Sequence, residues 1–141
     1  MKAKTILILL LTAMLIFTAA CDSAGNTSGS ANNSSSASAQ SIGSGGTTFS
    51  FIMVDGDGNS HAWNVSTNET TVGAALVGVG LIEGEVSDFG MMVSHVNGVR
   101  ADFMEDDAWW AFYIDDEMAM AGVDSIDIED GVTYSFVYTP A

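Results

Sequence analysis

The sequence has 141 residues, with 3 Lys and Arg against 18 Asp and Glu and a formal net charge of −15, a length that suits one ordinary domain with extensions. Lys2 and Lys4 lie in the first five residues, so Arg100 is the only fixed cation of the remaining chain. So little positive charge cannot neutralise phosphates, which excludes nucleic acids and anionic lipid headgroups as partners. The single cysteine excludes an intramolecular disulfide and a multi-cysteine zinc site.

Residues 1–20 have the pattern of an export signal. Lys2 and Lys4 form a short basic region, and the 15 residues from 6 to 20 are uncharged and mostly apolar. A membrane-spanning helix needs roughly 20 apolar residues, whereas a run of this length suits the apolar region of a signal peptide. We therefore predict a signal peptide over residues 1–20.

Cys21 directly follows two small residues, Ala19 and Ala20, at the end of the apolar region. This arrangement resembles the lipobox of bacterial lipoproteins, in which the thiol is diacylated and the signal is cut just before it. Thr18 stands where the usual pattern has Leu. The resemblance implies lipidation of Cys21 and an extracytoplasmic protein, lipid-anchored to the cell membrane by two acyl chains. An ordinary signal peptide with a chance cysteine is the alternative.

Residues 21–48 predict this lipidated cysteine followed by a tether. From Asp22 to Thr48 the chain consists almost wholly of Ser, Ala, Gly, Asn and Thr. So little apolar surface cannot offset the entropy of ordering, so we expect a flexible coil with a mean reach of roughly 30 Å. The composition changes sharply at Phe49, and residues 49–141 predict one domain.

The domain is predicted to open with a β-hairpin. Alternating side chains over residues 49–54 and again over 62–65 predict its two strands, and the Asp-Gly-Asp-Gly-Asn segment at 55–59 is typical of the turn between them. This segment also resembles the start of an EF-hand calcium loop. Ser60 and Ser66 stand where that motif needs Gly and Glu. We therefore favour a plain turn and assign no metal site.

A short helix is expected next. Thr70 or Thr71 can cap its start, and Gly80 suits its end. Between them, apolar residues recur at i, i+3, i+4 and i+7 and form one helical face. These residues are Val72, Ala75, Leu76 and Val79.

Five more strands are predicted after a loop. Residues 91–96 form the first, and Asn97-Gly98 is typical of a two-residue hairpin turn that returns the chain through 99–103. Residues 110–114 alternate as a further strand. A turn at 115–116 then leads into a short strand near Met118. The last strand follows residues 130–131 and carries three aromatic side chains on one face: Tyr134, Phe136 and Tyr138. This order predicts an α+β fold of the β-grasp type, in which a mixed sheet curls around one short helix.

Five segments in this order resemble a known family. They are 71–76, 96–99, 109–114, 121–124 and 130–136. Together they are similar to the transcobalamin-like C-terminal domain of many bacterial surface lipoproteins, over nearly all of residues 49–141. One departure is Asp115-Asp116, where the family often has Asn-Gly. The resemblance implies a β-grasp fold similar to the β-domain of animal cobalamin carriers, and a corrinoid or similar flat ligand. No large helical domain, which forms the other half of the site in those carriers, is expected in this sequence.

Trp109 and Trp110 are the strongest candidates for a ligand site. Strand alternation puts them on opposite faces, so if Trp110 packs inside with Phe112 and Ile114, then Trp109 faces outward beside Tyr113. An exposed Trp/Tyr pair suits stacking on a flat ligand or anchoring a protein partner. The alternative is that both faces of the strand are covered and both indoles belong to the core.

The two histidines, His61 and His95, are in phase with apolar strand residues, which favours partly buried structural roles. A surface His95 would be able to coordinate the cobalt of a corrinoid, so it joins Trp109, Trp110 and Tyr113 as a ligand-binding candidate. No catalytic constellation rises above chance. We therefore expect no enzyme activity and no required cofactor.

Two functions from different classes fit these observations. The first is a cell-surface lipoprotein that binds a small flat ligand, such as a corrinoid, for uptake. The second is a tethered interaction or envelope-assembly module that docks on another envelope protein without a small ligand. Residues 49–141 hold 17 acids and Arg100, a net charge of −16, which disfavours polyanions and leaves neutral or cationic partners.

Overall fold

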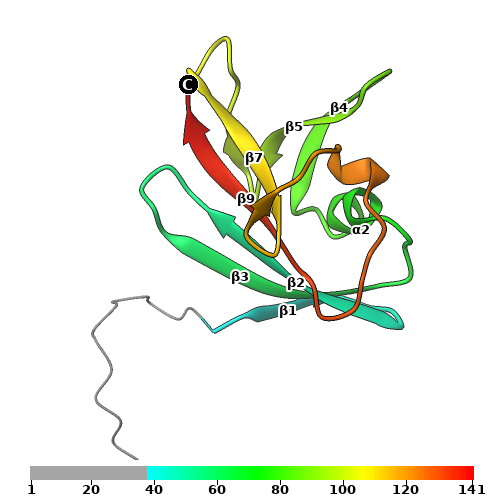
Figure 1. Cartoon of the computed structure of the whole chain (residues 1–141). Helices are drawn as coiled ribbons and strands as arrows, with labels where there is room; N and C mark the ends of the chain where they lie inside the picture. Colours follow the sequence, from blue (N-terminus) through cyan, green and yellow to red (C-terminus); the bar gives the residue numbers. More distant parts are fainter. Residues whose placement is uncertain (1–37) are drawn as a thin grey trace, which may run out of the picture. The chain divides into compact units, whose positions relative to one another are not determined.

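The computed structural model describes residues 38–141, which contain two β-sheets, a short α-helix and a 3-10 turn (Figure 1). Within this range no helix is long and apolar enough to cross a membrane. The predicted signal peptide, Cys21 and most of the predicted tether lie outside the described residues.

The larger sheet has six strands in the order β1-β3-β2-β9-β7-β8. Its strands are β1 (Gln40–Gly43), β2 (Thr47–Val54), β3 (Ser60–Thr67), β7 (Ala108–Ile114), β8 (Glu117–Met118) and β9 (Thr133–Pro140). β9 pairs in parallel with β2 and antiparallel with β7, and β1 pairs in parallel with β3. The sheet is therefore mixed, which together with the helix confirms the predicted α+β class.

The smaller sheet has three antiparallel strands in the order β4-β5-β6. These are β4 (Ile82–Ser87), β5 (Gly90–Val96) and β6 (Val99–Arg100). The helix α2 (Val72–Gly78) contacts β3, β4 and the 3-10 turn η1 (Val123–Ser125). Figure 1 shows α2 and η1 close together below the β4–β5 hairpin.

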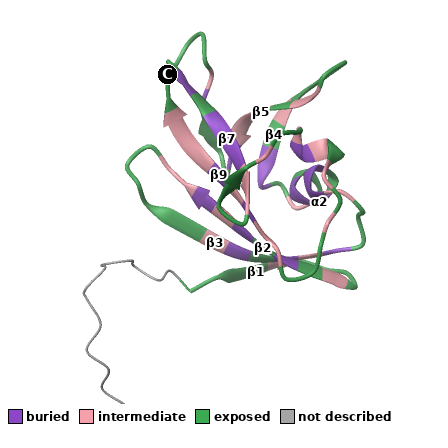
Figure 2. Ribbon diagram, in the orientation of Figure 1, coloured by how far each residue is buried: buried purple, intermediate pink, exposed green. Residues whose placement is uncertain are grey.

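The core lies between the larger sheet and α2 (Figure 2). Phe136 of β9 is its central ring: it stacks on Phe112 of β7 with ring centroids 5.0 Å apart and meets Phe51 of β2 edge-on at 6.2 Å. α2 buries three apolar side chains against these rings: Val72, Ala75 and Leu76. Because aromatic side chains bury large areas and pack in preferred geometries, this cluster fixes how the central strands lie against the helix.

Tyr134 ties the segment before β9 to the core. Its hydroxyl accepts a hydrogen bond from the Glu129 N–H at 2.9 Å and donates one to the Asp127 carbonyl at 3.2 Å. Burial raises the pKa of Tyr134 above the usual tyrosine value. The neutral hydroxyl therefore serves as the polar end of an otherwise apolar contact.

The helix begins and ends where the sequence predicted. The Thr71 hydroxyl caps α2 by accepting from the Ala74 N–H at 3.4 Å. At the other end Gly80 has φ of 73°, its N–H bonds the Val77 carbonyl, and the Leu81 N–H bonds the Leu76 carbonyl. This is a Schellman motif, which needs a left-handed residue and so favours glycine.

The predicted two-residue turns are confirmed. Residues 97–98 have φ of 48° and 78°, and residues 115–116 have φ of 46° and 69°, so both central positions are left-handed in each turn. In the loop at 55–59 one Asp55 carboxylate oxygen accepts from the Asp57 and Asn59 N–H groups at 3.0 and 2.8 Å. Hydrogen bonds from Asn59 lower the pKa of Asp55. The carboxylate thus organises a turn, as expected.

Two strands lie where none was predicted. β1 falls inside the predicted flexible tether, where Ile42 is its one partly buried residue and the pairing with β3 supplies the rest. β4 falls inside the predicted loop. It was not predicted because Glu83, Gly84 and Glu85 interrupt the alternation of apolar and polar residues. Conversely, the predicted return strand over 99–103 is limited to Val99–Arg100. Pairing with a neighbouring strand, rather than local composition, determines whether these segments form strands and how far they extend.

Two glycines of α2 provide a matched test of this packing. A methyl group on Gly73 would lie 2.8 Å from the Asp124 Cα, whereas one on Gly78 would meet nothing within 4 Å. We expect Gly73→Ala to lower the free energy of unfolding by about 1–3 kcal/mol through overpacking. Gly78→Ala should raise it by about 0.5–1 kcal/mol through helix propensity. Urea unfolding followed by tryptophan fluorescence measures both, and equal stabilisation by the two substitutions would contradict the close approach of α2 to η1.

Candidate ligand-binding groove

Two adjoining cavities lie between β5 and β7 and share Met92, Val93 and Trp109. Their volumes are about 260 Å³ and 350 Å³. β5 and β7 belong to different sheets, although they contact each other. We call the two cavities together the β5–β7 groove.

The groove exists because each strand leaves part of one edge unpaired. β8 pairs with β7 only at Tyr113 and Ile114, and β6 pairs with β5 only at His95 and Val96. Within the described part of the chain, no strand covers the remaining length of either edge. Side chains of the two strands therefore line a shared depression instead of a continuous sheet.

The first cavity is predominantly apolar. β5 contributes Met91 to Val93, β7 contributes Trp109, Trp110 and Phe112, and the segment after β8 closes the far side with Ala119 and Gly122 among others. Trp110 is 5% exposed and meets the ring of Tyr138 edge-on at 5.5 Å. Its indole N–H has no hydrogen-bond partner among the described residues.

The second cavity combines apolar and polar groups. Met92, Phe103 and Trp109 supply apolar surface, while Glu85 and His95 are among its polar lining residues. The His95 Nδ1 lies 3.0 Å from the hydroxyl of its neighbour, Ser94. The groove thus offers apolar contact along its floor and hydrogen-bonding or coordinating groups at one end.

The loop beside this cavity is held by Arg100. Its guanidinium bonds Glu105, and it pairs with Asp106 at 3.5 Å and with Asp102 at 3.9 Å. The hydrogen bond to Glu105, with the surrounding carboxylates, raises the pKa of Arg100. The only cation of the described residues is therefore engaged by acids of its own loop, and the loop keeps Phe103 at the groove.

The structure brings together three of the four predicted ligand-binding residues. Trp109 is 38% exposed whereas Trp110 is buried, so of the two alternatives left open the structure shows the one in which only Trp110 belongs to the core. Trp109 and His95 line the second cavity, and Trp109 and Trp110 line the first. Tyr113 is half-buried and lies outside the residues that line the groove. The binding role of all four residues stays a prediction.

The two histidines have different surroundings. His95 is partly buried, as predicted, whereas His61 is exposed and lies 3.5 Å from the Asp55 carboxylate. The expectation of a partly buried His61 was wrong: although it is in phase with the buried Trp63, it lies at the start of β3 next to the turn at 55–59, where its side chain stays exposed. Among residues 38–141 no three His, Cys, Asp or Glu side chains are grouped so that they could hold a metal ion.

Two groove residues, Met92 and Phe103, are not among the four predicted ligand-binding residues. The adjacent methionines Met91 and Met92 were a usable signal, because methionine pairs often form adaptable apolar surfaces. Phe103 gave a weaker one: it is a large apolar residue next to a run of acids. Both are exposed and line the second cavity.

The family described as "Domain of unknown function (DUF4430)" matches residues 68–139, slightly more than half of the chain. The chain belongs to this family. The match begins at the end of β3 and runs into β9, so it covers both strands of the groove. No curated protein matches the sequence at a significant level.

Two solved structures share the fold. One is a protein from Ruminococcus gnavus ATCC 29149 proposed to bind metal, with 19% identity, a TM-score of 0.64, and coverage of 68% of this chain and 99% of that one. The other is haptocorrin in complex with Cbi, with 14% identity, a TM-score of 0.56, and coverage of 67% of this chain. The match spans only 25% of haptocorrin. At these identities the likeness shows the fold alone.

Removing the charge of Arg100 tests whether it orders the loop. We expect Arg100→Gln to increase amide hydrogen exchange at Met104, Glu105 and Asp106, because three acids of one loop would then lack a counterion. The increase should be larger at low ionic strength, where like charges are less screened. Arg100→Lys, which keeps the charge without the planar fork, should be intermediate. Unchanged amide hydrogen exchange in Arg100→Gln would show that the loop stays ordered without Arg100.

Proposed function

We propose that the chain is a cell-surface lipoprotein whose β-grasp domain binds a small flat ligand in the β5–β7 groove. The observation that carries the proposal is the position of Trp109. Its half-exposed indole lies where the two cavities adjoin, with Met92 and Val93 beside it. A large aromatic face on an apolar floor is suited to stacking against a planar ligand.

The proposal extends to a corrinoid as the ligand. Haptocorrin, which has the same fold over the matched region, was solved in complex with Cbi. The Ruminococcus gnavus protein is described as a metal binder. A corrinoid is both flat and metal-containing, so one ligand class accommodates both descriptions. In this chain Trp109 would stack on the ring and His95 would be the candidate for cobalt coordination, because both line one cavity.

The size of the groove bears on affinity. Each cavity is near or below the lower end of the roughly 300–1,000 Å³ typical of ligand pockets. A flat ligand therefore has to lie across both cavities and leave one face uncovered. With half of its surface still in water, we expect a dissociation constant on the order of micromolar.

Lipidation at Cys21 completes the proposal. The apolar segment and the small residues before Cys21 support signal cleavage and diacylation, which would hold the domain outside the cytoplasm on the membrane surface. The Ser-, Gly- and Asn-rich segment would let the groove reach away from the bilayer. The protein would act as a binding protein for uptake rather than as an enzyme, with no cofactor required for a reaction.

Binding is tested by titrating the full chain with cobalamin and with cobinamide while following tryptophan fluorescence. We expect saturable quenching, and Trp109→Ala should weaken binding about tenfold or more because it removes the stacking face. Val77→Ser is the matched control, since Val77 is exposed on α2, outside the lining of the groove. Absence of quenching at high micromolar ligand would exclude the corrinoid.

The corrin absorbance separates coordination from stacking. If His95 binds cobalt, the visible spectrum should shift on binding to wild type and stay unshifted with His95→Gln. Stacking alone predicts the same spectrum for both proteins, with affinity depending only on Trp109. A shift that survives in His95→Gln would rule out this histidine as the ligand.

The anchor has a direct test of its own. We expect Cys21→Ser to move the protein from the membrane fraction to the soluble fraction, because two acyl chains are needed for stable attachment. Mass spectrometry of the wild-type N-terminal peptide should show the mass of a lipidated cysteine. A wild-type protein that starts with an unmodified residue would support the alternative of an ordinary signal peptide.

A further inference from the structure

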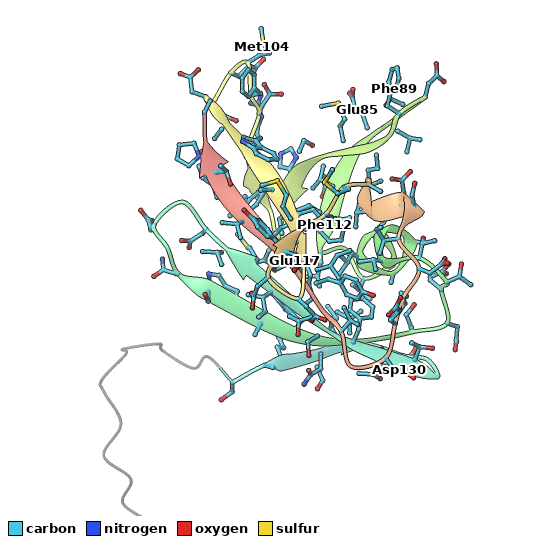
Figure 3. All side chains as sticks on the ribbon, in the orientation of Figure 1. Glu85, Phe89, Met104, Phe112, Glu117 and Asp130 are labelled. Atoms are coloured by element: carbon cyan, nitrogen blue, oxygen red, sulfur yellow. The ribbon has the colours of Figure 1, made fainter. Side chains whose placement is uncertain are left out.

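Large apolar side chains are concentrated at two arms beside the groove. One arm is the β4–β5 hairpin, residues 82–96, and the other is the loop 101–107 with the start of β7. Of the ten large hydrophobic residues that are exposed in residues 38–141, six lie on these arms. They are Val86, Phe89, Met92, Phe103, Met104 and Trp109. Figure 3 shows Phe89 and Met104 near the ends of the two arms.

The tip of the hairpin arm is ordered. The Ser87 hydroxyl accepts from the Phe89 N–H at 3.2 Å and donates to the Gly90 carbonyl at 2.9 Å. This tight turn places Phe89 with 99% of its surface exposed. Because the hydrogen bonds of this turn hold the Phe89 ring in water, the exposure of Phe89 is a property of the fold.

The tip of the loop arm is ordered too. One Asp102 carboxylate oxygen accepts from the Met104 and Glu105 N–H groups at 2.8 and 3.0 Å, and an Asp106 carboxylate oxygen accepts from the Asp102 N–H at 3.0 Å. Met104 is 85% exposed on this frame. The two arms meet at the second cavity, which Glu85 and Met92 line from one arm and Phe103 from the other.

Acidic residues surround this apolar surface. The hairpin arm carries Glu83, Glu85 and Asp88 with no Lys or Arg. The loop arm carries four acids, Asp102, Glu105, Asp106 and Asp107, next to Arg100, which is already paired with three of them. The hairpin arm therefore has a net charge of −3, and the loop arm together with Arg100 also has −3, so that the apolar tips lie among negative charges.

This combination selects one class of partner. A second copy of the domain, residues 49–141, would bring another −16 charge to the same surface and be repelled. Anionic lipids and nucleic acids are repelled for the same reason. We infer that the two arms form a docking surface for a basic protein segment, whose apolar side chains contact Phe89 and Met104 and whose Lys or Arg residues face the surrounding acids. This goes beyond the proposed ligand function, because it concerns the arm tips rather than the groove.

The inference is tested with synthetic peptides and the full chain in nanodiscs of zwitterionic phosphatidylcholine, by calorimetry with empty nanodiscs as the blank. Three short peptides of equal length are compared: alternating Lys and Leu, alternating Lys and Ser, and alternating Glu and Leu. We expect the Lys/Leu peptide to bind about tenfold or more tightly than Lys/Ser, and Glu/Leu not to bind. Higher salt should weaken Lys/Leu binding. Equal binding of Lys/Leu and Lys/Ser, or binding of Glu/Leu, would overturn the inference.

Matched variants locate the surface. Phe89→Ser with Met104→Ser should weaken Lys/Leu binding about tenfold or more, and Glu85→Gln with Asp88→Asn should weaken it and reduce its salt dependence. Met120→Ser is the control, because Met120 is 98% exposed and outside the arms. The exposed positions make these substitutions tolerable to the fold. If the double serine variant binds the peptide as wild type does, the arms are not the docking surface.

The outcome is independent of the ligand proposal. Phe89→Ser with Met104→Ser should leave corrinoid binding unchanged, since neither residue lines the groove. Trp109→Ala should lose corrinoid binding and keep most of the peptide binding. Loss of both by either variant would mean that the arms and the groove are a single site, which contradicts a separate docking surface.

Discussion

β9 pairs with β2 on one side and with β7 on the other, and the arrangement of the domain depends on these two pairings. Phe136 of β9 contacts rings from both neighbours, so the parallel and the antiparallel pairing bury one aromatic cluster. Because β7 is held along its whole length by β9, the two indoles of Trp109 and Trp110 are fixed on opposite faces of one strand. A shift of one residue in this register would exchange the buried and exposed indoles.

The groove follows from where the sheets stop pairing. β7 is covered on its outer side only near its end, and β5 likewise, so the two strands leave facing edges that side chains fill incompletely. Polar and apolar side chains are separated in space: the core and the groove floor are apolar, while most of the acids occupy loops and turns. Arg100 pairs with three acids of one loop and so leaves no cation of residues 38–141 free to offset the others. The surface around the groove consequently remains strongly negative.

Features with a local cause were predictable from the sequence. Thr71 and Gly80 bound the helix because their side-chain and backbone preferences act within one turn, and Asn97-Gly98 turns the chain for the same reason. Alternation also placed Trp109 and Trp110 on opposite faces, but that one face is covered and the other exposed depends on the tertiary fold. β1 was missed because its pairing with β3, which is not its neighbour in sequence, stabilises it, and β4 was missed because Glu83, Gly84 and Glu85 interrupt its alternation. The groove was missed in part because its lining, including Met92 and Phe103, converges from segments that only the tertiary fold brings together.

The central claim is that the β5–β7 groove is a binding site, and the three tryptophan indoles can report on it separately. In a ¹H–¹⁵N spectrum of the full chain, each indole N–H gives its own signal, and Trp63 lies in β3, outside the groove lining. On addition of cobinamide, the account predicts that the Trp109 signal shifts most, that Trp110 follows, and that Trp63 stays in place. Unchanged signals from Trp109 and Trp110, or a shift confined to Trp63, would contradict it.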